Sequence, residues 1–167
     1  MSHIIYIRQA LLEDIPALEH IKPVFEEGYF ARCLQEQEGG KRAVFLAERD
    51  GLAAGYTIYN RRPQYALYKR LEIPEIQDLN VLPEYRREGI GTALIRHCED
   101  LAQQEGHRHI GISVGLYKDY GAAQRLYTRL GYIPDGNGVT YDREAVTAGE
   151  LRPVDDNLCL MMVKNLP

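Results

Sequence analysis

The stretch that decides the fold is Leu79-Asn80-Val81-Leu82-Pro83-Glu84-Tyr85-Arg86-Arg87-Glu88-Gly89-Ile90-Gly91-Thr92-Ala93-Leu94. Its first residues alternate in the manner of a β-strand, and Pro83 ends that strand. Apolar residues at helical spacing follow the two glycines. The stretch therefore predicts a strand, a glycine-rich turn and the start of a helix.

The glycine-rich turn has the composition of an anion-binding site. A helix leaves its first four N–H groups without partners and carries roughly half a positive charge at its N-terminus. Gly89 and Gly91 have no side chains that would hold a bulky anion away from those groups. Arg86 and Arg87 add positive charge. The sequence therefore predicts that this turn binds a pyrophosphate.

Two common phosphate loops do not match this turn. A nucleotide P-loop needs lysine and then serine or threonine after its glycines, but Thr92 follows Gly91 directly. A dinucleotide fingerprint needs a third glycine where this chain has Leu94. The turn instead resembles the phosphate loop of the GNAT superfamily of acyl-CoA N-acyltransferases, whose fixed positions hold Arg86, Gly89 and Gly91 here. A plain glycine turn before a helix is the alternative.

A second motif supports this resemblance. The run from Ala123 to Tyr132 is similar to the late GNAT motif Ala-x-x-Leu-Tyr-x-x-x-Gly followed by Phe or Tyr, and every fixed position is present. Two motifs in the correct order are far more specific than either alone. One departure is Tyr120, because many family members carry a cofactor-contacting Asn there; a phenol at this position could still reach the cofactor.

The composition indicates an ordinary globular protein. The 167 residues, of which 45% are hydrophobic and 26% charged, suit one domain over residues 1–167. A net charge of -4 disfavours nucleic acid as a partner. The three cysteines, Cys33, Cys98 and Cys159, are widely spaced, and the five histidines form no metal-binding pair, so we expect neither disulfides nor a metal.

No apolar run approaches the roughly 20 residues needed to span a bilayer, and no signal-peptide pattern begins the sequence. We therefore expect a cytoplasmic protein without a membrane partner. The sequence leaves a homodimer open.

The remaining chain predicts alternating strands and helices. Predicted helices cover residues 14–21, with Asp14 at the start, 24–37, 90–106 and 119–131, with Asp119 as cap. Asp50-Gly51 predicts a hairpin, and residues 60–73 are expected to be an irregular connection. The predicted strands cover residues 4–8, 43–48, 52–59, 75–81, 110–114 and 158–163, and Tyr132-Ile133 opens a further strand. This order is that of the GNAT fold: a mixed α/β class, with a mostly antiparallel sheet of about seven strands and about four helices on its faces.

The resemblance implies an N-acetyltransferase that uses acetyl-CoA as co-substrate and acetylates a primary amine by direct attack on the thioester. The amine belongs to an unidentified small molecule or peptide. A non-catalytic acyl-CoA-binding sensor is the alternative function. The implied cofactor-binding residues are Leu79, Asn80, Val81, Arg86, Arg87, Glu88, Gly89, Ile90, Gly91, Thr92, Tyr120 and Ala123.

Two residues have implied catalytic roles. Tyr127 matches the family tyrosine that protonates the leaving thiolate; the alternative is a core tyrosine. Glu75 stands where some family members carry a glutamate base, with Asp78 and Glu72 as competitors. Regular strand alternation would place Glu75 and Asp78 on opposite faces unless a bulge intervenes. A solvated acid with a water chain as the proton acceptor is the other reading.

Overall fold

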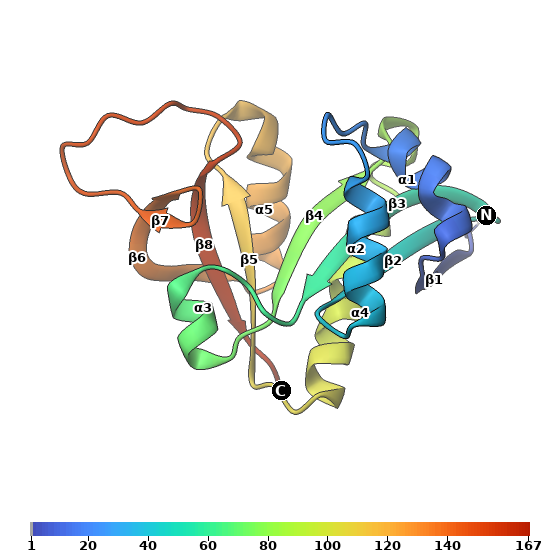
Figure 1. Cartoon of the computed structure of the whole chain (residues 1–167), viewed down its shortest axis with the longest axis horizontal. Coiled ribbons are helices and arrows are strands. Elements are labelled where there is room, and N and C mark those ends of the chain that lie inside the picture. Colours follow the sequence, from blue (N-terminus) through green and yellow to red (C-terminus); the bar gives the residue numbers. More distant parts are fainter. Residues whose placement is uncertain (1) are drawn as a thin grey trace. The chain divides into compact units, whose positions relative to one another are not determined.

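The computed structural model describes residues 2–167, which group into two compact units. Unit 1 comprises the chain up to Arg62 together with Ile76–Leu101, and unit 2 comprises Pro63–Glu75 together with Ala102–Pro167. The described residues form eight strands and five α-helices, with three short 3-10 helices between them (Figure 1). The mixed α/β class is confirmed.

Unit 1 contains the N-terminal elements and the glycine-rich turn. Its elements are β1 (Ile5–Gln9), η1 (Leu12–Asp14), α1 (Ile15–Ile21), α2 (Tyr29–Glu38), β2 (Arg42–Arg49), β3 (Leu52–Asn60), β4 (Glu75–Val81), η2 (Pro83–Tyr85) and α4 (Ile90–Gln104). Unit 2 contains α3 (Ala66–Leu71), β5 (His109–Gly115), η3 (Lys118–Tyr120), α5 (Gly121–Arg129), β6 (Ile133–Tyr141), β7 (Glu144–Ala145) and β8 (Leu158–Asn165). Glu75, the first residue of β4, and the last turn of α4 belong to unit 2.

The strands of unit 1 follow the order β1-β2-β3-β4. Strand β2 pairs antiparallel with both β1 and β3. The turn between β2 and β3 is the predicted Asp50-Gly51 pair, with φ values of 52° and 83°. Positive φ at both central residues is what a two-residue hairpin requires, so this prediction is confirmed.

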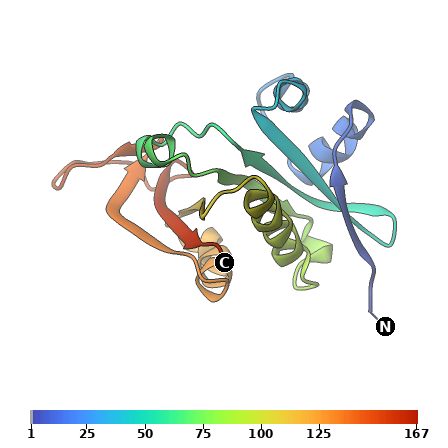
Figure 2. The ribbon, with the colours of Figure 1, turned by 90° about the horizontal axis from the view of Figure 1, so that it is seen from below.

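Strand β2 is buried on both faces. Val44 and Leu46 pack into a core with Phe30 of α2. The neighbouring Phe45 ring instead meets His97 of α4, with ring centroids 4.4 Å apart. Figure 2 shows α1 and α2 on one face of these strands and α4 on the other. This two-sided burial explains why β2 is a continuous apolar run.

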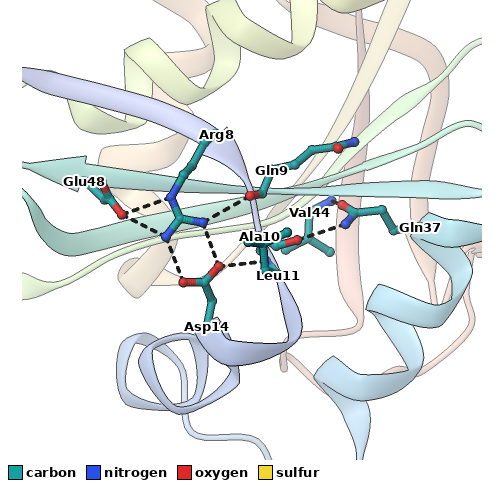
Figure 3. Close-up of polar contacts among 8 residues, drawn as sticks. All are labelled: Arg8, Gln9, Ala10, Leu11, Asp14, Gln37, Val44 and Glu48. Atoms are coloured by element: carbon teal, nitrogen blue, oxygen red, sulfur yellow. Dashed lines mark hydrogen bonds and ion pairs between the residues drawn. The ribbon is translucent and has the colours of Figure 1, made fainter.

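A polar network fixes the start of the chain (Figure 3). Arg8 donates two hydrogen bonds to Asp14, of 2.7 and 2.8 Å, and also bonds the carboxylate of Glu48 on β2. The Gln37 side chain donates to the carbonyl of Ala10 and accepts from the backbone N–H of Val44. These bonds satisfy backbone groups where β1 leaves the sheet, and they attach α1 and α2 to β2.

The strands of unit 2 follow the order β5-β8-β6-β7, and all their pairings are antiparallel. Helix α3 covers one face of β5 and β8 through Tyr68, which is buried with Ile73 and Met161. The Tyr68 hydroxyl donates to the carbonyl of Met162. A Cβ on Gly111 would overlap the Tyr68 ring, so the glycine allows this helix to approach the strand.

Three local predictions were wrong. Helix α2 begins at Tyr29, not at residue 24, because Gly28 adopts a left-handed φ of 75° in front of it. Phe25, which the predicted helix over residues 24–37 included, lies before α2 and is fully exposed. Residues 66–71, expected to be irregular, form α3, which brings the helices to five. Asp119 lies in η3, and α5 begins at Gly121 without a side-chain cap. The two-residue strand β7 brings the strands to eight.

Candidate functional site

The glycine-rich turn joins β4 to the N-terminus of α4. A 3-10 helix, η2, starts at Pro83, and Gly89 then adopts a φ of 85° directly before the 15-residue helix α4. A Cβ placed on Gly89 would meet no heavy atom within 4 Å, so the protein itself leaves the space beside this residue open. Arg86 and Arg87 are both exposed. Their charges and the first N–H groups of α4 supply what an anion needs.

The other predicted cofactor-binding residues of this turn differ in how deeply they are buried and in their contacts. Ile90 is buried, and Gly91 and Thr92 lie half-buried in the first turn of α4. Glu88 forms an ion pair with Arg49 of β2, with 2.9 Å between Oε2 and Nε. Because this pair holds the Glu88 carboxylate toward β2, the residue fixes the turn to the sheet. Any cofactor contact from Glu88 would be through its backbone.

The predicted cofactor-binding residues Leu79, Asn80 and Val81 occupy the last part of β4 and are half-buried. The Arg86 side chain folds back and donates to the Val81 carbonyl at 3.2 Å. A Cβ on Gly55 of β3 would meet the Asn80 carbonyl oxygen at 2.8 Å, so β3 and β4 approach closely here. Strand, turn and helix start are therefore held together within unit 1.

Asp78 interrupts the regular alternation of β4. It has a φ of 53°, so the simple rule that would place Glu75 and Asp78 on opposite faces does not apply. Its carboxylate accepts hydrogen bonds from the hydroxyls of Tyr56 (2.6 Å) and Tyr29 (3.3 Å) and from the amide of Asn80 (2.9 Å). Burial, followed by the charge of Asp78, raises the pKa of both phenols, which therefore remain hydrogen-bond donors.

Glu75, the predicted base, has no exposed surface. The guanidinium of Arg143, in the turn between β6 and β7, lies 3.1 Å from its Oε1. The competitor Glu72 is exposed and ends α3 with a φ of 54°. Of the three acids, Glu75 is thus the one that is fully buried and forms an ion pair with an arginine of unit 2.

Tyr127, the predicted acid, is buried on α5 with 6% of its surface exposed. Its ring lies 6.3 Å from that of Tyr132, at a tilt of 59°. Burial raises the pKa of Tyr127 to about 12. The phenol therefore keeps its proton at neutral pH and can donate a hydrogen bond.

A family model described as the acetyltransferase (GNAT) family matches residues 5–132. The chain belongs to the GNAT acetyltransferase family. The match includes both sequence motifs, from the turn at Arg86 to Tyr132.

Individual relatives give the extent of the similarity. An uncharacterized N-acetyltransferase of Methanocaldococcus jannaschii is 33% identical over 104 residues, which are 62% of this chain and 43% of that protein. Another from Archaeoglobus fulgidus is 32% identical over 89 residues, 53% of this chain and 58% of the relative. The chain thus spans about half the length of these two curated relatives.

A solved structure supports the fold. The yncA structure from Salmonella typhimurium, determined with its cofactor acetyl-CoA, has a TM-score of 0.69 and 17% sequence identity. The match covers 98% of this chain and 95% of that one. At this identity the comparison establishes a shared fold.

Tyr120 departs from the GNAT pattern in a defined way. Its hydroxyl donates to the Asp156 carboxylate at 2.8 Å, and the Tyr117 hydroxyl donates to the same oxygen. A Cβ on Gly115 would overlap the Tyr120 ring. The predicted contact of Tyr120 with the cofactor stays a prediction. In the structure, the hydrogen-bond acceptor of this phenol is the Asp156 carboxylate. Ala123, the other predicted cofactor residue on α5, is half-buried.

Unit 1 brings together residues 79–81 and 86–92 of the predicted site, and unit 2 holds Glu75, Tyr120, Ala123 and Tyr127. Sequence reasoning missed Arg143 and the phenols of Tyr29 and Tyr56. The tyrosines lie on core-facing elements, where an apolar role is the default expectation. Arg143 lies in the turn before β7, a two-residue strand that the sequence did not predict, so no local signal pointed to it.

The described part of the chain lacks two kinds of structure. Residues 2–167 contain no group of three or more metal-ligating side chains, and no helix among them is long and apolar enough to cross a membrane. The cytoplasmic location, the single-domain organisation and the homodimer stay predictions.

Proposed function

We propose that the chain transfers the acetyl group of acetyl-CoA to a primary amine of a small molecule or peptide. Membership in a family of acetyltransferases supports this function. The observation that carries it is the turn before α4, where Gly89 adopts a left-handed φ between two exposed arginines and a 15-residue helix. This is the local structure that a pyrophosphate requires.

The residues present fit the cofactor. The open space at Gly89 and the exposed Arg86 and Arg87 would hold the pyrophosphate. Backbone groups at the end of β4, at Leu79 and Val81, would bind the amides of the pantetheine arm as an added strand does. When bound, acetyl-CoA supplies the acetyl group as an activated thioester.

Tyr127 is the proposed proton donor to the departing thiolate. A free thiol has a pKa of ~8.5, well below the value of about 12 to which burial raises the pKa of Tyr127. The phenol is therefore protonated at neutral pH when the thiolate departs, so it can hydrogen-bond the thiolate and then give up its proton, which the new amide nitrogen replaces. General-acid assistance of this kind is typically worth ~10²- to 10⁴-fold in rate.

The acceptor amine must lose a proton before it attacks. Alkylamines have pKa values of ~10.4 and α-amines of ~8, so most of the substrate is charged near neutrality. Glu75 is our proposed base. Because its carboxylate is fully buried, the proton would reach it through water or a local movement. Asp78, which is half-buried and held by two phenols, is the competing base.

The test is to incubate the protein with acetyl-CoA and a panel of amines, peptides and aminoglycosides, following free thiol and the mass of the acceptor. We expect thiol release that depends on the acceptor, with a gain of one acetyl group. Tight binding of acetyl-CoA without acetylation of any acceptor would favour the sensor instead. Comparing Glu75→Gln with Asp78→Asn would then identify the base. Removing the true base should reduce the rate far more for strongly basic acceptors than for weakly basic ones, whereas the other substitution should reduce the rate with all acceptors alike.

A further inference from the structure

The turn between β6 and β7 contains an arginine that the backbone does not favour. Tyr141 pairs with Glu144, so Asp142 and Arg143 form a two-residue turn, with φ values of 49° and 64°. A residue other than glycine in the left-handed region is strained, because its Cβ lies too close to the following carbonyl oxygen. The hairpin of unit 1 has the same arrangement with Gly51 in the second position. The backbone of the turn therefore does not explain Arg143.

The contact made by the side chain of Arg143 explains the arginine at this position. The side chain reaches from the turn to Glu75, 68 positions earlier in the chain, and donates from Nη2 to Oε1 at 3.1 Å. The Glu75 side chain is 0% exposed, whereas that of Arg143 is 31% exposed. A buried carboxylate without a nearby cation is unfavourable, because it has lost its hydration, and it takes up a proton instead. The ion pair thus offsets the strain of the turn.

The groups around Glu75 show how its charge is balanced. The Tyr68 phenol on α3 and the Cys159 thiol on β8 both have pKa values raised, first by burial and then in part by the negative charge of Glu75. Arg143 acts on the Cys159 thiol in the opposite direction. The groups that α3 and β8 contribute here, the Tyr68 phenol and the Cys159 thiol, are therefore uncharged at neutral pH, and the turn between β6 and β7 contributes a positive charge.

We propose that Arg143 is a positioning residue that keeps Glu75 ionised and oriented, so that Glu75 can accept the proton of the acceptor ammonium. This role rests on the proposed acetyltransferase function. One proton passes from the ammonium group through water to Glu75. The neutral amine then forms the C–N bond as the C–S bond breaks, and the thiolate receives its proton from Tyr127. The phenol regains a proton from the new amide nitrogen, and Glu75 returns its own to water.

Two acceptors separate this role from a purely structural one. An alkylamine is charged near neutrality and needs a base, whereas O-methylhydroxylamine is already neutral and does not. Arg143→Gly converts the turn to the Asp-Gly form of the first hairpin and so relieves its strain. We expect this variant to lose on the order of 10²-fold in kcat with the alkylamine, with a much smaller loss for O-methylhydroxylamine and an unchanged KM for acetyl-CoA. Arg143→Lys should recover part of the loss.

A double-variant cycle provides the second measurement. If Arg143 acts through Glu75, then Glu75→Gln with Arg143→Gly should be no slower than Glu75→Gln alone, and it should fold more stably than Arg143→Gly because no charge remains buried. Arg8→Ala is the matched control: Arg8 is 28% exposed and paired with a nearly buried Asp14. It should lower the melting temperature and leave the ratio of the two acceptor rates unchanged.

The outcomes separate the two proposals. Equal losses with both acceptors, or additive losses in the cycle, would overturn the role of Arg143 while the acetyltransferase function stands. If the wild-type protein acetylates no acceptor, both proposals fall together.

Discussion

Gly89→Ala tests the proposed pyrophosphate site most directly. Gly89 has a φ of 85°, and an added Cβ would meet no protein atom within 4 Å. The substitution should therefore cost backbone strain of about 1–2 kcal/mol without a steric clash in the protein. For a chain of this length, that corresponds to a melting temperature lower by roughly 2–8 °C.

Gly106→Ala is the matched control at the other end of the same helix. Gly106 follows α4 with a φ of 86°, and an added Cβ there also meets no atom within 4 Å. Both variants should lose the same stability, so any difference in ligand binding reflects the site. A methyl group at residue 89 should remove at least one charge-assisted hydrogen bond to phosphate, worth about 1.5–3 kcal/mol. This weakens CoA binding by roughly 10- to 150-fold.

The assay is titration calorimetry with CoA, together with thermal unfolding of both variants. A folded Gly89→Ala protein that binds CoA as tightly as Gly106→Ala would refute the placement of the pyrophosphate. Equal weakening in both variants would do so too, because strain alone would then account for the effect.

Three further predictions follow from single contacts. Tyr127→Phe should reduce kcat by ~10²- to 10⁴-fold with little change in CoA affinity or melting temperature; a wild-type rate, with chemistry shown to be rate-limiting, would make Tyr127 a core residue only. Gly111→Ala should destabilise the protein by about 1–3 kcal/mol, because the new Cβ overlaps the Tyr68 ring, and denaturant unfolding measures this; Tyr68→Leu in the same background should recover part of the loss. The hydrogen bonds from Arg8 hold the pKa of Asp14 below its ordinary value of 3.8. The stability from this pair is therefore complete above that value and is lost as the pH falls through the lowered pKa. Asp14→Asn should be less stable at neutral pH and less sensitive to acid, and parallel acid-unfolding curves would contradict the assignment.

Much of the fold could be predicted because local signals agreed with tertiary structure. The Asp50-Gly51 hairpin and the helix between Gly89 and Gly106 have turn residues and apolar periodicity that point to the same elements. Helix α2 was placed too early because its apolar spacing extends through Phe25, and spacing alone does not show that Gly28 takes a left-handed φ. Helix α3 was missed because only six residues form it, and Tyr68 is held there by packing under Gly111.

The candidate site was predictable where it depends on backbone conformation. Glycine at position 89 and the proline that ends β4 determine a local shape, and that shape is readable from the residues themselves. Side-chain partners distant in sequence were not readable. Nothing local links Glu75 to Arg143, or Asp78 to Tyr29 and Tyr56, because these pairs form only when strands and helices pack.

The contact between Tyr120 and Gly115 has a consequence for how related sequences can vary. Since any side chain at 115 would overlap the Tyr120 ring, the two positions should change together. We expect relatives with asparagine at the position of Tyr120 to tolerate alanine or serine at that of Gly115, and to show no preference for an acid at that of Asp156, which here receives the phenol. Glycine, tyrosine and aspartate at these three places would then mark a subgroup of GNAT proteins in which the last long loop is attached to the start of α5.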